Sequence, residues 1–164
     1  MILQTERAIL TPLSKADFSE ILSMYSEADS NKFIPPLLNK TEDYFIQFLE
    51  GKVKVNEHTV GFWTVRSKNN NEYIGTVNLN QFKDTSINHI GAHISKKFWN
   101  QGYAFELLKE LMNYGFQVRK LDAIHGIVSE DHHVSKKLLN RLGIVFLKEY
   151  DIDGKIAHLH RKEA

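Results

Sequence analysis

The sequence predicts an α+β domain built around a mixed sheet of about seven strands flanked by about four helices. Helical spacing within residues 14–51 gives way to strand alternation between residues 58 and 95. A strand–helix–strand element over 87–128 requires a right-handed crossover and a parallel strand pair. A hairpin signal at Asp153-Gly154 adds an antiparallel pair. With no repeat, linker or low-complexity tract, residues 1–164 are expected to form one domain.

The N-terminal third predicts one strand and two helices. Residues 7–12 form the strand, and Ser14 caps a helix that runs to about Ser26. The apolar stripe of this helix consists of Phe18, Ile21, Leu22 and Tyr25. Thr41 caps the second helix, which is expected to end at Gly51. Its inward face carries Tyr44, Phe45, Phe48 and Leu49.

The remaining elements follow in a regular order. Three strands are predicted at 58–66, 72–80 and 87–95, with a turn at Asn69-Asn70-Asn71 between the first two. An amphipathic helix opens at Gly102 and ends near Arg119. The later elements are a strand at 123–128, a helix at 134–142 stopped by Gly143, and strands at 144–150 and 155–161.

Composition narrows the class of protein. Hydrophobic residues make up 42% and charged residues 25% of the chain, as in ordinary soluble domains. A net charge of +1 does not indicate a nucleic-acid surface, and no apolar run approaches the roughly 18 residues of a membrane span. The absence of cysteine excludes disulfides, thiolate metal sites and a cysteine nucleophile. The N-terminus lacks the pattern of a signal peptide, and a cytoplasmic location is expected.

The segment from His89 to Glu106 carries most of the functional information. An alternating strand leads into a short loop, and the loop opens the helix at Gly102. Several backbone N–H groups and the positive end of a helix dipole then converge on one place. The sequence therefore predicts an anion site, and a pyrophosphate is the expected occupant.

Trp99-Asn100-Gln101-Gly102-Tyr103-Ala104 resembles the acetyl-CoA pyrophosphate loop of the GNAT acetyltransferases, most closely the RimJ/RimL-type branch. Further segments resemble that family in the same order along nearly the whole chain. They are Thr5–Leu13 at its opening strand, Tyr73–Val77 at its middle strand and Ser135–Gly143 at its late helix. The resemblance implies the GNAT fold and acetyl transfer from acetyl-CoA.

The resemblance assigns the cofactor contacts. The amides of Asn100, Gln101, Gly102, Tyr103 and Ala104 would cradle the pyrophosphate, and the amide of Ile94 would serve the oxyanion. Gly102 lets the backbone approach phosphate oxygens closely. Two residues depart from the family: Asn100 stands where glycine is frequent, and Gln101 stands where a basic residue is common. Asn tolerates unusual backbone angles, so the loop is expected to keep its turn. The change to Gln101 leaves one cation fewer near the phosphates.

Two histidines of the strand at 87–95, His89 and His93, lie on one face because side chains alternate along a strand. His89 stands where many relatives have glutamate, and an imidazole could act as the base at neutral pH. The alternative is that both are strand histidines with ordinary hydrogen bonds, which is the favoured interpretation for His93.

The late helix provides the candidate acid. Many GNAT enzymes place a tyrosine at the position of Leu139, whereas this branch tends to carry a serine one turn earlier, which Ser135 matches. Its hydroxyl could donate to the departing thiolate, or Ser135 could be an ordinary residue of the helix's first turn. His132 occupies the place of an asparagine that usually contacts the pantetheine arm, and imidazole can donate one such hydrogen bond.

A metal site is the weaker interpretation of the remaining histidines. His132-His133 and the pair His158 and His160 could supply ligands, but no cysteine or carboxylate pattern accompanies them. No metal is therefore expected.

The resemblance thus implies an acetyl-CoA-dependent N-acetyltransferase that acts on a primary amine by direct transfer. Its RimJ/RimL-type branch favours a protein or peptide N-terminal α-amine of the ribosomal-protein type as the acceptor. A polyamine or aminoglycoside acceptor stays open, with acids available in the first helical region at Glu27, Asp29, Glu42 and Asp43. A third interpretation is a GNAT-fold module that binds acetyl-CoA without catalysis. Nucleic acid and membrane partners are not expected, and exposed strand edges would allow a homodimer.

Overall fold

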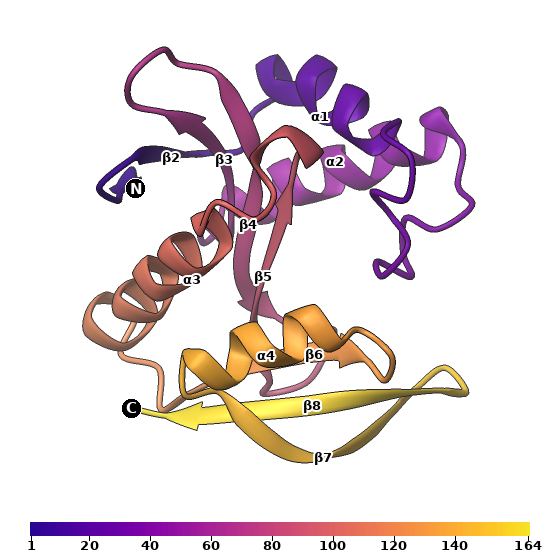
Figure 1. Cartoon of the computed structure of the whole chain (residues 1–164), viewed down its shortest axis with the longest axis vertical. Coiled ribbons are helices and arrows are strands. Elements are labelled where there is room, and N and C mark those ends of the chain that lie inside the picture. The colour runs from indigo at the N-terminus through magenta and orange to yellow at the C-terminus, as the bar shows by residue number, and fades with distance from the viewer. The chain divides into compact units, whose positions relative to one another are not determined.

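The computed structural model describes residues 1–164, which divide into two compact units (Figure 1). Unit 1 combines Met1–Asn78 with Ala92–Tyr103, and unit 2 combines Leu79–Gly91 with Ala104–Ala164. The chain therefore passes between the units three times, within two strands and at the start of a helix. No helix has both the length and the apolar character needed to cross a bilayer. The expectation of one domain over 1–164 stays a prediction.

Unit 1 holds the N-terminal strands and the first two α-helices. Its elements are β1 (Leu3–Gln4), β2 (Ala8–Pro12), the 3₁₀ turn η1 (Lys15–Asp17), α1 (Phe18–Tyr25), α2 (Glu42–Asn56), β3 (Phe62–Ser67), most of β4 (Tyr73–Gln81), the end of β5 (Asn88–Ile94) and the 3₁₀ turn η2 (Lys96–Phe98). Strands β1 to β4 form an antiparallel ladder in chain order, with Leu10 opposite Val65 and Trp63 opposite Val77. Its helical core gathers Leu13, Ile21, Met24, Tyr25, Leu37 and Leu49.

Local sequence signals explain both the agreements and the differences in unit 1. Thr41 caps α2 as predicted, since its hydroxyl accepts the Tyr44 amide at 3.3 Å. The prediction that this helix ends at Gly51 is wrong, because α2 continues to Asn56. Gly51 is exposed, and a Cβ added there would meet nothing within 4 Å. Val53 beyond it packs on the core, which offsets the helix penalty of about 1 kcal/mol for glycine.

Two further strand boundaries differ from the prediction. The strand expected at 58–66 begins only at Phe62, because the Asn56 side chain accepts the amides of Gly61 and Phe62 at 3.0 and 3.1 Å and holds the preceding residues in a turn. The short strand β1, which places Leu3 opposite Leu10, was not predicted. It brings the number of strands to eight, against about seven predicted, beside the four α-helices expected.

The backbones of β4 and β5 approach closely near the end of β5. The Ser95 amide donates to the Ile74 carbonyl at 2.9 Å. A Cβ added to Gly75 would stand 2.2 Å from the His93 carbonyl oxygen. Only glycine therefore fits at position 75.

Unit 2 holds the parallel strand pair and the C-terminal hairpin. Its elements are the start of β5, α3 (Tyr103–Asn113, from its second residue), the π-helical turn η3 (Tyr114–Val118), β6 (Ala123–Ser129), α4 (His133–Arg141), β7 (Val145–Ile152) and β8 (Lys155–Glu163). The strand order within this unit is β5-β6-β8-β7. The pair β5–β6 is parallel, with His89 opposite His125, and the other pairs are antiparallel, which confirms the mixed strand pairing.

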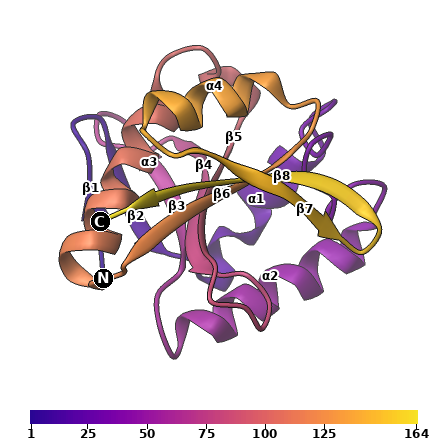
Figure 2. The same cartoon turned by 90° about the horizontal axis from the view of Figure 1, so that it is seen from below.

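The turns and helices of unit 2 follow from the sequence. Asp153 and Gly154 both have positive φ, 52° and 85°, as a tight hairpin turn requires. Helix α4 covers the β6–β8–β7 ladder (Figure 2), with Leu139 against the bare backbone of Gly126. The helix predicted from Gly102 to near Arg119 changes into a π-helical turn after Asn113, where the Arg119 amide reaches the Tyr114 carbonyl at 3.0 Å.

We expect opposite effects of alanine at two glycines of unit 1. Gly75→Ala should lower the free energy of unfolding by about 2–3 kcal/mol, because the added methyl meets backbone that cannot move aside. Gly51→Ala is the matched control and should raise it by about 1 kcal/mol, since it removes a glycine from an exposed helix interior. Urea unfolding of both variants measures the difference. Equal stabilities would contradict the close approach at Gly75.

Candidate functional site

The loop between β5 and α3 has the backbone of an anion site. It contains two residues of positive φ, Asn100 at 57° and Gly102 at 81°. The amides of Asn100, Gln101 and Gly102 donate to no backbone carbonyl, and the first-turn amides of α3 have no acceptor within the helix. Asn100 thus adopts the conformation expected for a residue that replaces glycine. The result is a run of donors at the positive end of a helix dipole.

Side chains of unit 1 hold this loop in shape. The Trp99 indole donates to the Ile94 carbonyl at 2.7 Å, and the Gln101 side chain donates to the Lys97 carbonyl at 2.8 Å. The Arg7 guanidinium donates to the Gln101 carbonyl at 2.9 Å and lies 4.0 Å from the centre of the Tyr103 ring. In a trans peptide, a carbonyl and the next amide point in opposite directions. Arg7 therefore aims the Gly102 amide away from itself.

Arg7 had no predicted role, although its segment belongs to the family resemblance. It lies 94 residues from Gln101, so nothing local in the sequence connects the two. In the structure its guanidinium holds the carbonyl side of the Gln101–Gly102 peptide. The signal that could have found it is that an arginine opens a strand in a segment already matched to the family.

The two lysines before the loop differ in their surroundings. Lys97 forms an ion pair with Glu72, and this contact lowers the pKa of the Glu72 carboxyl. The Lys96 ammonium lies 5.7 Å from the centre of the half-exposed Trp99 ring. Of the two, Lys96 is the better placed to attract an anion, because the charge of Lys97 is already matched.

His93 lies next to the last residue of β5 and contacts the segment that follows α1. Its Nε2 lies 2.7 Å from the Ser30 hydroxyl, and its ring stacks on Tyr25 with ring centres 5.2 Å apart. Burial lowers the pKa of His93 to about 4, so the ring is neutral at pH 7. This environment agrees with the interpretation of His93 as an ordinary, hydrogen-bonded strand histidine.

His89, the predicted base, lies in unit 2 on β5. Its Nδ1 lies 3.1 Å from the Asn80 carbonyl, and Phe82 meets the ring edge-on at 5.6 Å between centres. Because a carbonyl only accepts, Nδ1 must carry the proton in the neutral ring, and Nε2 then carries the lone pair that a base needs.

Ser135 and His132 are brought together at the start of α4. The Ser135 hydroxyl lies 2.9 Å from Nε2 of His132, which is the N-cap residue of the helix. Burial lowers the pKa of His132, so its ring is neutral at pH 7. Leu139, at the position of the family's tyrosine, is a buried core residue against Gly126. The hydroxyl-bearing candidate of this helix is therefore Ser135.

The predicted site residues fall in both units. Ile94 and the loop residues Asn100 to Tyr103 belong to unit 1, where hydrogen bonds join the loop to the end of β5. His89, His132, Ser135 and Ala104 belong to unit 2. The structure thus brings together Ile94 with the loop and Ser135 with His132.

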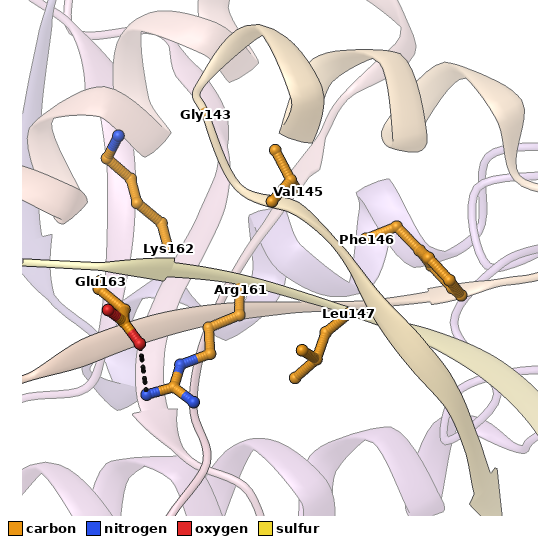
Figure 3. Close-up of a pocket in the computed structure, with 7 residues that line it drawn as sticks. All are labelled: Gly143, Val145, Phe146, Leu147, Arg161, Lys162 and Glu163. Atoms are coloured by element: carbon orange, nitrogen blue, oxygen red, sulfur yellow. Dashed lines mark ion pairs between the residues drawn. The ribbon is translucent and has the colours of Figure 1, made fainter.

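His158, His160 and the pocket beside β7 involve none of the predicted site residues. His158 and His160 flank the Phe146 ring, and no group of three potential ligands forms a metal site. A pocket of about 310 Å³ beside β7 is lined by Gly143, Val145, Phe146, Leu147, Arg161, Lys162 and Glu163 (Figure 3). Glu163 is paired with Arg161 at 3.3 Å, and the pocket contains none of the predicted site residues.

A family model and a curated relative both match this chain as an acetyltransferase. Residues 7–145 match the family described as "Acetyltransferase (GNAT) domain". The chain is 25% identical over 150 residues to the uncharacterized N-acetyltransferase YoaA of Bacillus subtilis, covering 90% of this chain and 84% of that protein.

Solved structures share the fold. A GNAT-family acetyltransferase from Bacillus anthracis superimposes with a TM-score of 0.84 at 19% identity, over 99% of this chain and 98% of that one. RimL, a ribosomal L7/L12 α-N-protein acetyltransferase solved with coenzyme A, superimposes with a TM-score of 0.83 at 11% identity, over 99% and 98% of the two chains. The α+β GNAT fold predicted from the sequence is thereby confirmed.

We expect the loop to tolerate glycine at position 100 and to reject a β-branched residue. Asn100→Gly should keep the affinity for coenzyme A within about twofold, because glycine adopts positive φ freely. Asn100→Val should weaken it about five- to tenfold, since a left-handed conformation costs a side-chain-bearing residue about 1–2 kcal/mol. Isothermal titration calorimetry with coenzyme A measures both.

Asn39, which also has a φ of 57° but lies in the segment between α1 and α2, provides the matched control. Asn39→Val introduces the same backbone strain and should leave the affinity unchanged. An equal loss of affinity in both valine variants would contradict a role for the loop.

Proposed function

Because the chain belongs to the GNAT acetyltransferase family, in its RimJ/RimL-like branch, we propose that it moves the acetyl group of acetyl-CoA directly to the N-terminal α-amine of a protein or peptide. The observation that carries the proposal is the loop before α3, whose unused amides converge at a helix N-terminus. In this proposal the amides of Asn100 to Ala104 bind the pyrophosphate of acetyl-CoA.

The acceptor is inferred from chemistry and from the neighbour RimL. An α-amine has a pKa near 8, whereas a lysine amine has one near 10.4, so its deprotonation at neutral pH is easier by about 3.4 kcal/mol. A weak base then suffices. RimL, which shares the fold, is by its name an α-N-protein acetyltransferase.

One of the carboxylates considered for binding a polycationic acceptor already has hydrogen-bond partners within the protein. Glu27 accepts hydrogen bonds from the Ser95 hydroxyl and from the Lys96 amide. This leaves Asp29, Glu42 and Asp43, all exposed, as acids that would favour a polyamine or an aminoglycoside. The small-molecule amine is therefore the second candidate acceptor.

The acetyl group would react at the end of β5. The Ile94 carbonyl is held by the Trp99 indole, which fixes this part of the strand, and the Ile94 amide is the proposed donor to the oxyanion. The amine attacks the thioester carbonyl, the oxyanion forms and collapses, and the thiolate leaves. The absence of cysteine excludes an acetyl-cysteine intermediate.

His89 is the proposed base and Ser135 the proposed acid. With Nδ1 of His89 donating to Asn80, its Nε2 would take the amine proton directly or through water. In the His132 tautomer that carries its proton on Nε2, that nitrogen donates to the Ser135 oxygen and leaves the hydroxyl proton for the thiolate. His132 would then orient Ser135, and its contact with the pantetheine arm stays a prediction.

An acetyl-CoA assay across three classes of amine tests the acceptor. N-terminal peptides, polyamines and aminoglycosides are incubated with the enzyme, thiol release is followed, and mass spectrometry locates the acetyl group. Acetylation of peptide α-amines supports the proposal, and acetylation of the small amines alone would replace it with the second candidate. Binding of acetyl-CoA by calorimetry with no thiol release on any amine would favour a non-catalytic module, which the exchanges at Gln101 and Leu139 keep open.

We expect two substitutions in unit 2 to change catalysis differently. Ser135→Ala should lower kcat at least about tenfold with little change in the KM for acetyl-CoA, and Ser135→Thr should restore part of it, because only a hydroxyl is needed. His89→Gln should remove the acidic limb of the pH–rate profile, since glutamine does not titrate. Steady-state kinetics over pH 5–9 measure both. A wild-type pH profile in His89→Gln would exclude His89 as the base, and an unchanged kcat in Ser135→Ala would exclude Ser135 as the acid.

A further inference from the structure

Glu27 lies two residues beyond α1 and makes two contacts with the end of β5. Its Oε2 accepts the Lys96 amide at 2.8 Å, and its Oε1 accepts the Ser95 hydroxyl. These partners are 68 and 69 residues away in the sequence. The side chain is half-buried, so this carboxylate is a tertiary contact rather than a solvated surface charge.

The two contacts complete the cap of the turn η2. Ser95 is the N-cap residue of η2, but its side chain makes no capping hydrogen bond within the turn. Its hydroxyl instead donates to Glu27, and Glu27 also accepts the Lys96 amide, a first-turn amide that has no acceptor within the turn. The capping group of this turn is therefore supplied by a distant residue.

The loop is built on that turn. The Trp99 amide closes it by donating to the Lys96 carbonyl at 3.1 Å, and the Gln101 side chain returns to the Lys97 carbonyl. A displacement of η2 would therefore be passed to Asn100 and Gly102, whose amides face the proposed pyrophosphate.

The same segment makes a second contact on the other side of Ile94. Ser30 meets His93 through its hydroxyl at 2.7 Å, and both side chains are largely buried. Glu27 and Ser30 thus fasten one short segment to residues that precede and follow Ile94. With both carboxylate oxygens occupied by protein donors, Glu27 is suited to hold the turn rather than to bind an amine.

We propose that Glu27 is a positioning residue for acetyl-CoA: its carboxylate caps the turn Ser95–Phe98 and thereby sets the amides of the pyrophosphate loop. The inference rests on the proposed assignment of that loop to the pyrophosphate. It links the affinity for the donor to the segment that follows α1, a connection made by these side chains and not by the covalent chain.

The test compares Glu27→Ala and Glu27→Gln with Glu20→Ala. Glu20 lies on α1 itself and pairs with Arg66 at 2.6 Å. Glu27→Ala should raise the Kd for coenzyme A about tenfold, and Glu27→Gln about two- to threefold, because the amide oxygen can still accept the Lys96 amide. Glu20→Ala should destabilise the protein without changing the Kd. In kinetics, Glu27→Ala should raise the KM for acetyl-CoA while kcat at saturation stays within about twofold.

Ser95→Ala provides a milder change and a coupling measurement. It removes only the hydroxyl contact. The double variant with Glu27→Ala should bind like Glu27→Ala alone, because Glu27→Ala already removes the contact that Ser95→Ala removes. Ser95→Ala also keeps the test available if Glu27→Ala folds poorly.

The outcomes separate this inference from the loop assignment. A wild-type Kd in Glu27→Ala together with a weakened Asn100→Val overturns the role of Glu27 and leaves the loop assignment standing. Wild-type affinity in both variants overturns the loop assignment itself. A fall in kcat at unchanged KM in Glu27→Ala would place Glu27 in the chemistry and also overturn the inference.

Discussion

The peptide between Gln101 and Gly102 is the constraint on which the site depends. Its carbonyl is held by Arg7, so its amide must point the other way, toward the place of the anion. The positive φ of Gly102, and of Asn100 earlier in the loop, makes this orientation attainable. Trp99 and Gln101 then return hydrogen bonds to Ile94 and Lys97, so the loop is fixed to the end of β5. An anion site made of backbone amides has no side chain to compensate for a misplaced donor, and Arg7, Trp99 and Gln101 therefore serve to hold the shape of the loop.

Protonation states in the site follow from their hydrogen-bond partners. The Asn80 carbonyl accepts from His89 and thereby assigns the proton to Nδ1, while the Ser135 hydroxyl can either donate to or accept from His132. His89 is thus fixed in one tautomer, which suits its proposed role because a base needs a defined lone pair. His93 is neutral through burial and serves as a link between β5 and Ser30.

The order of the helices and strands and the position of the loop could be predicted from the sequence, because both depend on local signals. The hairpin at Asp153-Gly154 and the cap at Thr41 need only neighbouring residues, and the structure has them as predicted. The errors lie where side-chain contacts rather than periodicity decide: Gly51 remains inside a helix because Val53 packs on the core, and the start of β3 is set by the Asn56 side chain. The contacts of Arg7 with the loop and of Glu27 with the turn before it were not predicted, because they join segments far apart in the sequence. Their partners are 94 and 69 residues away, and no periodicity connects them.

The departures of this loop from its family can be understood together. Asn100 replaces a glycine but takes the positive φ that the turn requires, so the backbone geometry is kept. Gln101 replaces a basic residue, and its side chain serves the turn by bonding the Lys97 carbonyl. Lys96, beside Trp99, supplies a cationic group near the loop, whereas Arg7 stands on the carbonyl side of the Gln101–Gly102 peptide, opposite its amide. Positive charge near the loop thus comes from a neighbouring residue, while the amides keep their geometry. Since amides and the helix dipole supply the directional part of phosphate binding, and cations supply a less directional attraction, the loop can change its charge without losing its geometry.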